Sequence, residues 1–137
     1  MSHPIHPALV HFPIACWSLG TVADIAGIFF DKEISEMAVY LVATGLVTAI
    51  PTMLAGALDL KNLKQESAAQ DIAMSHITYV LIAWMLYAAT LYTRYKSSGD
   101  SLPISIVLSV AGFICLAVAG WYGGKLVYEH GVGVVKH

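Results

Sequence analysis

Histidines are the residues of this 137-residue chain whose type and spacing could do chemistry: His3, His6, His11, His76, His130 and His137. Neutral imidazole is a ligand for Zn, Cu and Fe ions and for haem iron. A histidine at membrane depth is costly and indicates a functional site. His11 and His76 each lie about one turn inside an apolar segment, so we predict that they are the leading ligand pair. His6 and His130 are weaker candidates, and the terminal His3 and His137 are expected to have no role.

The elements that position these histidines must lie in a membrane. Hydrophobic residues make up 58% of the chain, charged residues only 12%, and the mean hydropathy is +0.71. These values exclude a disordered chain and an ordinary soluble domain. The net charge is -2, and the seven Lys and Arg residues are scattered along the chain, which excludes a nucleic-acid partner. The lipid bilayer is therefore the first expected partner.

Four apolar runs are each long enough to cross a bilayer, which needs about 20 residues. They predict an all-α fold, an integral-membrane four-helix bundle with antiparallel up-down connectivity and both termini on one membrane face. The whole chain, 1–137, is expected to be one domain. Its predicted helices cover about 8–30, 37–58, 67–94 and 103–126, followed by an interfacial tail, 127–137. No leader peptide and no internal repeat is recognised.

Local signals refine these boundaries. Ser67 has capping-box spacing and predicts the start of the third helix. Pro13 and Pro51 lie inside the first and second spans, where we expect each to bend its helix without breaking it. Asp24 lies in the first span and would be costly alone, so we predict a structural ion pair with Arg94 at the end of the third.

This topology brings the candidate histidines to one membrane face. The basic residues are too evenly divided between the two faces to orient the protein by the positive-inside rule. Small residues also gather at this face, at Ala55, Gly56 and Ala57 and at Gly120, Gly123 and Gly124. They predict either close helix packing, because Gly120 and Gly124 have GxxxG spacing, or a cleft for a flat ligand beside the histidines.

Three functions remain open at this point. Haem b between two histidines needs an apolar slot and cations for its propionates, which Lys61, Lys64 and Lys125 could supply. A bare Zn, Cu or Fe ion would instead use the four histidines together with the carboxylate of Asp59. A cofactor-free accessory subunit of a larger membrane complex is the third interpretation. No motif of a hydrolase or phosphate-binding enzyme is present, so an electron carrier is favoured over a stand-alone enzyme.

Two end motifs resemble a bacterial membrane family catalogued as domain of unknown function 2231. They are His6-Pro7-Ala8-Leu9-Val10-His11-Phe12-Pro13-Ile14 and the segment from Gly120-Trp121-Tyr122-Gly123-Gly124 to Val134, which includes His130. Gly56 to Asp59 and His76 are similar to the family's middle signatures. The resemblance covers essentially the whole chain and implies a four-helix domain of the bacterial inner membrane with these histidines as its marked polar positions. Fusions of relatives to cytochrome c-like or Rieske-type domains imply electron transfer by association.

We therefore predict a small b-type cytochrome that carries single electrons, with haem b bound by His11 and His76. His6 and His130 are expected to form a second pair or to support the first. The expected partners on the histidine face are a redox protein or a larger membrane complex, and further copies of the chain remain open.

Overall fold

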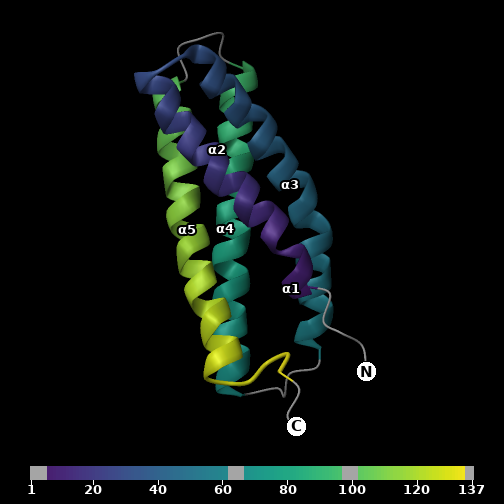
Figure 1. Ribbon diagram of the computed structural model, residues 1–137. Helices are drawn as coiled ribbons and strands as arrows, with labels where there is room; N and C mark the ends of the chain where they lie inside the picture. The colour runs from purple at the N-terminus through teal and green to yellow at the C-terminus, as the bar shows by residue number, and fades with distance from the viewer. Residues whose placement is uncertain (1–5, 62–66, 97–101, 135–137) are drawn as a thin grey trace.

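The computed structural model describes residues 6–61, 67–96 and 102–134, and the elements in these ranges are all helical. Figure 1 shows the helices α1 (His6–Leu9), α2 (His11–Phe29), α3 (Lys32–Leu60), α4 (Ala68–Lys96) and α5 (Leu102–Tyr128). The short α1 is separated from α2 by one residue and continues into it, so α1 and α2 together form one of four long helical segments, called rods below. The predicted all-α, four-helix fold is confirmed. Three residues named in the sequence analysis, His3, Lys64 and His137, lie outside the described residues.

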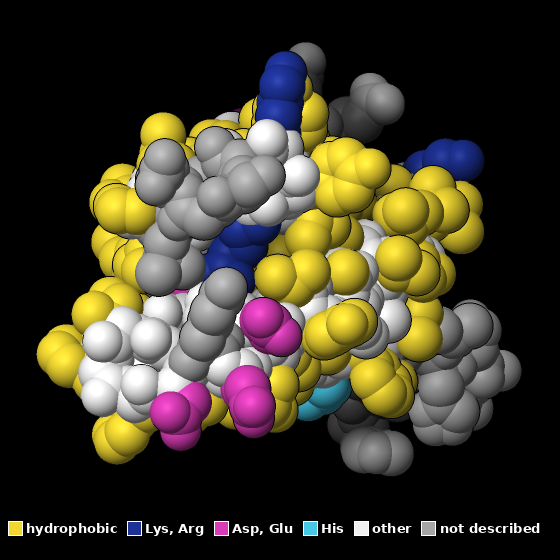
Figure 2. All heavy atoms as spheres, turned by 90° about the horizontal axis from the view of Figure 1, so that it is seen from above, with side chains coloured by type: hydrophobic (Ala, Val, Ile, Leu, Met, Phe, Trp, Pro, Cys, Tyr) yellow, Lys and Arg dark blue, Asp and Glu magenta, His cyan; other side chains and the backbone are white. Residues whose placement is uncertain are grey.

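The flank of the bundle is apolar, as an integral membrane protein requires. Four segments are long and apolar enough to cross a membrane: His6–Phe29, Glu33–Leu60, Ala68–Lys96 and Pro103–Tyr128. Large hydrophobic side chains point outward along them, for example Val47 at 67% and Leu54 at 63% exposure. Figure 2 looks down on one end of the bundle and shows acidic side chains gathered there, with hydrophobic ones around the side. The lipid bilayer solvates such a flank without penalty.

The four rods pair as two antiparallel hairpins. Helix α2 packs mainly on α3, and α4 packs mainly on α5, while contacts between the two hairpins are fewer. The first and last described residues lie at the same end of the bundle (Figure 1). We call this the histidine end and define it by His6, Gly56, His76 and Gly123. The opposite end is defined by Asp24, Ser35 and Arg94.

The core between the rods consists largely of small and hydroxylated residues. Ala38, Ala49, Ala73 and Ala83 are at most 4% exposed, and Ser105 and Ser109 are fully buried. Small side chains let the helix backbones approach closely, which is how helices associate where lipid offers no hydrophobic driving force. The largest buried groups are the stacked rings of Trp17 and Tyr87, whose centroids are 4.9 Å apart.

The break between α1 and α2 has a specific cause. Pro13 has no backbone N–H and cannot bond the carbonyl of Leu9, which therefore loses its partner within the helix. The helix is interrupted at one residue, Val10, whose backbone stays in the right-handed helical region. The hydroxyl of Thr52 on α3 lies 3.4 Å from the free Leu9 oxygen. The same hydroxyl lies 2.8 Å from the Thr48 oxygen of its own helix, so the Leu9 oxygen is the weaker of its two acceptors. Helix α3 continues as one helix through Pro51.

Three helix ends add detail to the predicted boundaries. Helix α3 begins at Lys32, directly after Asp31, whose backbone is extended. The negative charge of Glu33 in the first turn interacts favourably with the helix dipole. Helix α4 begins after Ser67, whose hydroxyl accepts a hydrogen bond from the Gln70 N–H at 3.3 Å. After α5, Gly131 has a φ of 62° and turns the chain back, a conformation that glycine adopts without strain.

Candidate functional site

His6 is held against α3 at the histidine end. Its Nδ1 atom lies 2.9 Å from the backbone oxygen of Thr52. A Cβ atom added at Gly56, one turn further along α3, would come within 3.1 Å of the His6 ring. Gly56 therefore leaves the space that lets the imidazole reach a carbonyl inside the helix. That carbonyl can accept this second hydrogen bond because its oxygen has two lone pairs.

His76 makes the same arrangement on the other hairpin. Its Nδ1 atom lies 2.8 Å from the backbone oxygen of Ala119 on α5. A Cβ atom added at Gly123, again one turn further along, would come within 3.3 Å of the His76 ring. Both side chains are half-buried. Each hairpin thus positions one histidine by a helix carbonyl and a glycine four residues later.

These hydrogen bonds determine the tautomer of both rings. A carbonyl oxygen can only accept, so Nδ1 of His6 and of His76 must carry the proton and donate it. The lone pair of each neutral ring is then on Nε2, the atom through which such a histidine binds a metal. The structure therefore places two half-buried imidazoles at the histidine end, one on each hairpin, each oriented by a helix carbonyl.

The other two candidate histidines have different surroundings. The His11 side chain is exposed, and its contact is local: Nδ1 lies 3.4 Å from the backbone oxygen of Ala8, three residues earlier. His130 is also exposed and lies in the turn after α5. The leading pair predicted from the sequence was His11 and His76, but the histidine whose surroundings match those of His76 is His6, which also lies against a helix carbonyl beside a glycine. The roles of all four remain predictions.

Further predicted site residues are distributed around this pair. Gly123 contacts His76, whereas a Cβ atom at Gly120 would meet nothing within 4 Å and one at Gly124 would meet only Tyr128 of its own helix. Asp59 and Lys125 are half-buried in the last turns of α3 and α5. Lys125 lies 3.9 Å from Glu129.

Two tyrosines complete this part of the bundle. The ring centroids of Tyr79 and Tyr122 are 5.8 Å apart, with nearly parallel planes. Tyr79 follows His76 by three residues on α4, and Tyr122 follows Ala119 by three on α5. Residues three apart on a helix are neighbours on its surface, so the stacked rings stand next to the His76 hydrogen bond. They give the second hairpin an aromatic wall at the histidine end.

A bare-ion site of the predicted composition is not assembled by these residues. Within 6–61, 67–96 and 102–134, no group of three or more His, Cys, Asp or Glu side chains is arranged to hold a metal ion. Structural and catalytic zinc sites take three or four protein ligands. A haem iron bound by two imidazoles needs only two protein ligands, because the porphyrin supplies the others.

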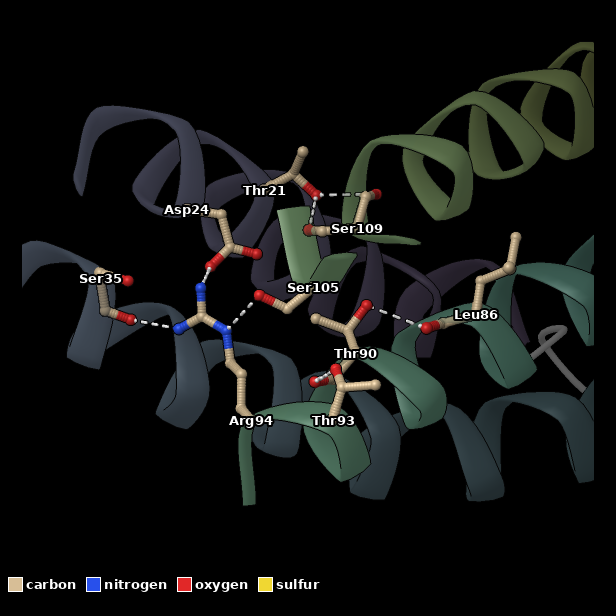
Figure 3. A network of polar contacts seen from close by, with 9 residues as sticks. All are labelled: Thr21, Asp24, Ser35, Leu86, Thr90, Thr93, Arg94, Ser105 and Ser109. Carbon is tan, nitrogen blue, oxygen red and sulfur yellow. Dashed lines mark hydrogen bonds and ion pairs between the residues drawn. The ribbon is translucent and has the colours of Figure 1, made fainter. Parts of the chain in front are cut away.

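The opposite end contains a buried ion pair that is confirmed as predicted. Arg94 donates hydrogen bonds to the Asp24 carboxylate, to the backbone oxygen of Ser35 at 2.7 Å and to the Ser105 hydroxyl at 3.2 Å (Figure 3). Asp24 is fully buried. A planar guanidinium with several donors can satisfy three elements at once, so this residue joins α4 to α2, α3 and α5.

Hydroxyl groups continue from this pair toward the middle of the bundle. The Thr21 hydroxyl lies 2.9 Å from that of Ser109 and 2.8 Å from that of Tyr87. The Tyr87 hydroxyl in turn lies 3.3 Å from the backbone oxygen of Trp17. Sequence reasoning missed this network, because isolated Ser and Thr residues in apolar segments show no periodicity that separates buried from lipid-facing positions.

Comparison with known proteins identifies the family. No curated protein and no solved structure matches the chain. The profile of a family described as predicted membrane protein (DUF2231) matches residues 2–136. The match covers almost all of the chain and agrees with the four membrane-length helices. The protein is therefore an integral membrane protein that belongs to the DUF2231 family of predicted membrane proteins.

Proposed function

We propose that this protein binds haem b at the histidine end and carries single electrons. The observation on which the proposal depends is the pair of imidazoles, His6 and His76, each donating its Nδ1–H to a helix carbonyl. This hydrogen bond is the support that metal-ligating histidines generally have, because it orients the ring and raises the basicity of Nε2. Here it recurs on two hairpins that face each other.

The surrounding residues fit such a group. Gly56 and Gly123 let the two rings lie against the helix backbones, and the Tyr79–Tyr122 stack offers a flat aromatic wall. Lys125, half-buried at the same end, is a candidate partner for a propionate. Haem b, when bound, would accept and return one electron at its iron. The chain would orient the imidazoles, exclude water with its apolar helices and present this end to a one-electron redox protein.

The first experiment is spectroscopic. The protein purified in mild detergent, from cells supplied with a haem precursor, is expected to show a sharp Soret band and split visible bands after reduction with dithionite. Metal analysis of the same sample should give iron in proportion to haem. A flat visible spectrum would contradict the proposal. Bound zinc, copper or iron without haem would then support the bare-ion alternative, and no cofactor at all would support an accessory subunit.

A glycine substitution tests whether the carbonyl contact matters. Gly123→Ala places a methyl group 3.3 Å from the His76 ring, which must give by a few tenths of an ångström and so strains its hydrogen bond to the Ala119 oxygen. Loss of such a supporting hydrogen bond lowers metal affinity by about 10- to 100-fold in other proteins. We expect haem affinity to fall by about tenfold or more. The measurement is haem titration of the apoprotein followed at the Soret band.

The matched control lies one turn away on the same helix. Gly120→Ala makes the same chemical change where no atom lies within 4 Å. We expect its haem affinity to equal that of the unchanged protein. Equal affinities for Gly123→Ala and Gly120→Ala would show that the glycine beside His76 has no part in haem binding.

A further inference from the structure

The two hairpins of this bundle are built on the same plan, although no repeat is recognised in the sequence. A residue of α2 and its counterpart in α4 are 70 positions apart in the chain. The hydrogen-bonded residues Trp17 and Tyr87 have this offset, and so have Asp24 and Arg94, which form the ion pair. His6 and His76 have the same offset. Two pairs in contact between the hairpins, Trp17 with Tyr87 and Asp24 with Arg94, therefore join corresponding positions, and His6 and His76 are a third corresponding pair.

Contacts within each hairpin are repeated too, with an offset of 67 in the second helix. His6 lies 2.9 Å from the Thr52 oxygen and packs against Gly56. At the corresponding positions, His76 lies 2.8 Å from the Ala119 oxygen and packs against Gly123. In the same way, Gly45 leaves space for the Trp17 ring and Gly112 for the Tyr87 ring. A Cβ atom at these two glycines would lie 2.5 and 3.0 Å from the respective rings.

Burial follows the same correspondence. Five positions of α3 that are buried have buried counterparts in α5: Ala38 and Ser105, Val42 and Ser109, Gly45 and Gly112, Ala49 and Leu116, Thr52 and Ala119. Between α2 and α4, the buried counterparts are Pro13 and Ala83, Trp17 and Tyr87, Gly20 and Thr90. The side chains differ in size and polarity at most of these positions. What is repeated is the backbone arrangement and the face that each helix buries.

Such a pattern is that of two copies related by a two-fold axis. Across an isologous interface each contact occurs twice, and residues on the axis meet their own counterparts. Asp24 meets Arg94 and Trp17 meets Tyr87 on this axis. His6 and His76 are the corresponding pair at the histidine end. The axis runs along the bundle because α2 and α4 run in the same direction (Figure 1).

We infer that the histidine end is a two-fold site in which His6 and His76 are equivalent ligands of one haem iron, so that both axial positions are filled by the protein. This inference rests on the proposed function and goes beyond it, because it restricts the substrate. An iron with two protein imidazoles has no open position for oxygen, carbon monoxide or peroxide. With haem bound, the site would exchange one electron with a redox protein while His6 and His76 continue to hold the iron.

The test uses the full chain in detergent and two small ligands as probes. Carbon monoxide added to the reduced protein, and cyanide added to the oxidised protein, are expected to leave the spectrum unchanged. His6→Gly and His76→Gly, produced with imidazole in the medium and buffers, should each regain haem to the same extent. After imidazole is removed, the haem that is retained should bind carbon monoxide in both variants. A single symmetric peak on size exclusion establishes that each variant is folded.

Each outcome separates the inference from the proposed function. A protein without haem would overturn both. A haem protein that binds carbon monoxide without any substitution, or that needs only one of the two histidines, would overturn the two-fold site and leave haem binding intact. An unchanged spectrum with carbon monoxide and equal behaviour of the two variants supports the inference.

Discussion

Replacing Arg94 by Met is expected to be among the most damaging single changes at the opposite end of the bundle. The fully buried Asp24 carboxylate would lose its ionic partner, and the oxygens of Ser35 and Ser105 would lose a donor. Breaking a buried pair by removing one partner costs about 3–5 kcal/mol. We expect a clear drop in the melting temperature in mild detergent, measured by size exclusion after heating, and a low yield of folded protein.

Two further variants make this result specific. Lys96→Met removes a cation two residues away that is exposed and whose contacts among the described residues are with the hydroxyl and ring of Tyr92, so the melting temperature should not change. Asp24→Arg combined with Arg94→Asp exchanges the charges between positions that correspond across the two-fold axis. The exchange should recover part of the lost stability because an ion pair forms again. A stable Arg94→Met protein would show that the pair is not a structural requirement and would favour a role in proton transfer.

The fold could be predicted from the sequence because a bilayer demands long apolar helices with polar connections. Length, hydropathy and capping signals define such helices without knowledge of their neighbours. The Asp24–Arg94 pair could be predicted for a related reason. A lone charge at membrane depth needs a partner, and the topology places few candidates at the same depth.

The choice between His6 and His11 could not be made in the same way. Both lie near the start of the first span, and depth alone favours His11. The difference depends on Pro13, which interrupts the helix at Val10, and on Gly56 of a different helix, which makes room for His6. These are contacts between segments far apart in the chain, and a hydropathy pattern has no information about them.

The internal repeat was missed for a similar reason. Over the segments 6–26 and 76–96 and the segments 37–60 and 104–127, identical residues recur only at His6 and His76, Val10 and Val80, Leu41 and Leu108, Gly45 and Gly112, and Gly56 and Gly123. A different offset in the two helices, 70 and 67, hides even these. In a membrane, many side chains satisfy the same packing position as long as they are small or apolar. The retained glycines are those against which a ring packs.

Removal of either proposed haem ligand, His6 or His76, is expected to have the largest effect on function. His6→Ala and His76→Ala should each lower the haem bound per protein by more than about tenfold, because loss of a ligand costs at least as much as loss of its supporting hydrogen bond. Both side chains are half-buried at the histidine end, and Ala is compatible with a helix. The measurement is haem content of the purified, monodisperse protein from its reduced spectrum.

His11→Ala and His130→Ala are the matched controls, since both side chains are exposed and each removes one imidazole from the same end of the bundle. We expect them to retain full haem and an unchanged reduced spectrum. The comparison also decides between the two ligand pairs. If His11→Ala loses haem while His6→Ala retains it, the pair is His11 and His76, and the carbonyl contact of His6 only holds α1 against α3. Loss with His6→Ala and retention with His11→Ala assigns the iron to the two rings that Thr52 and Ala119 orient.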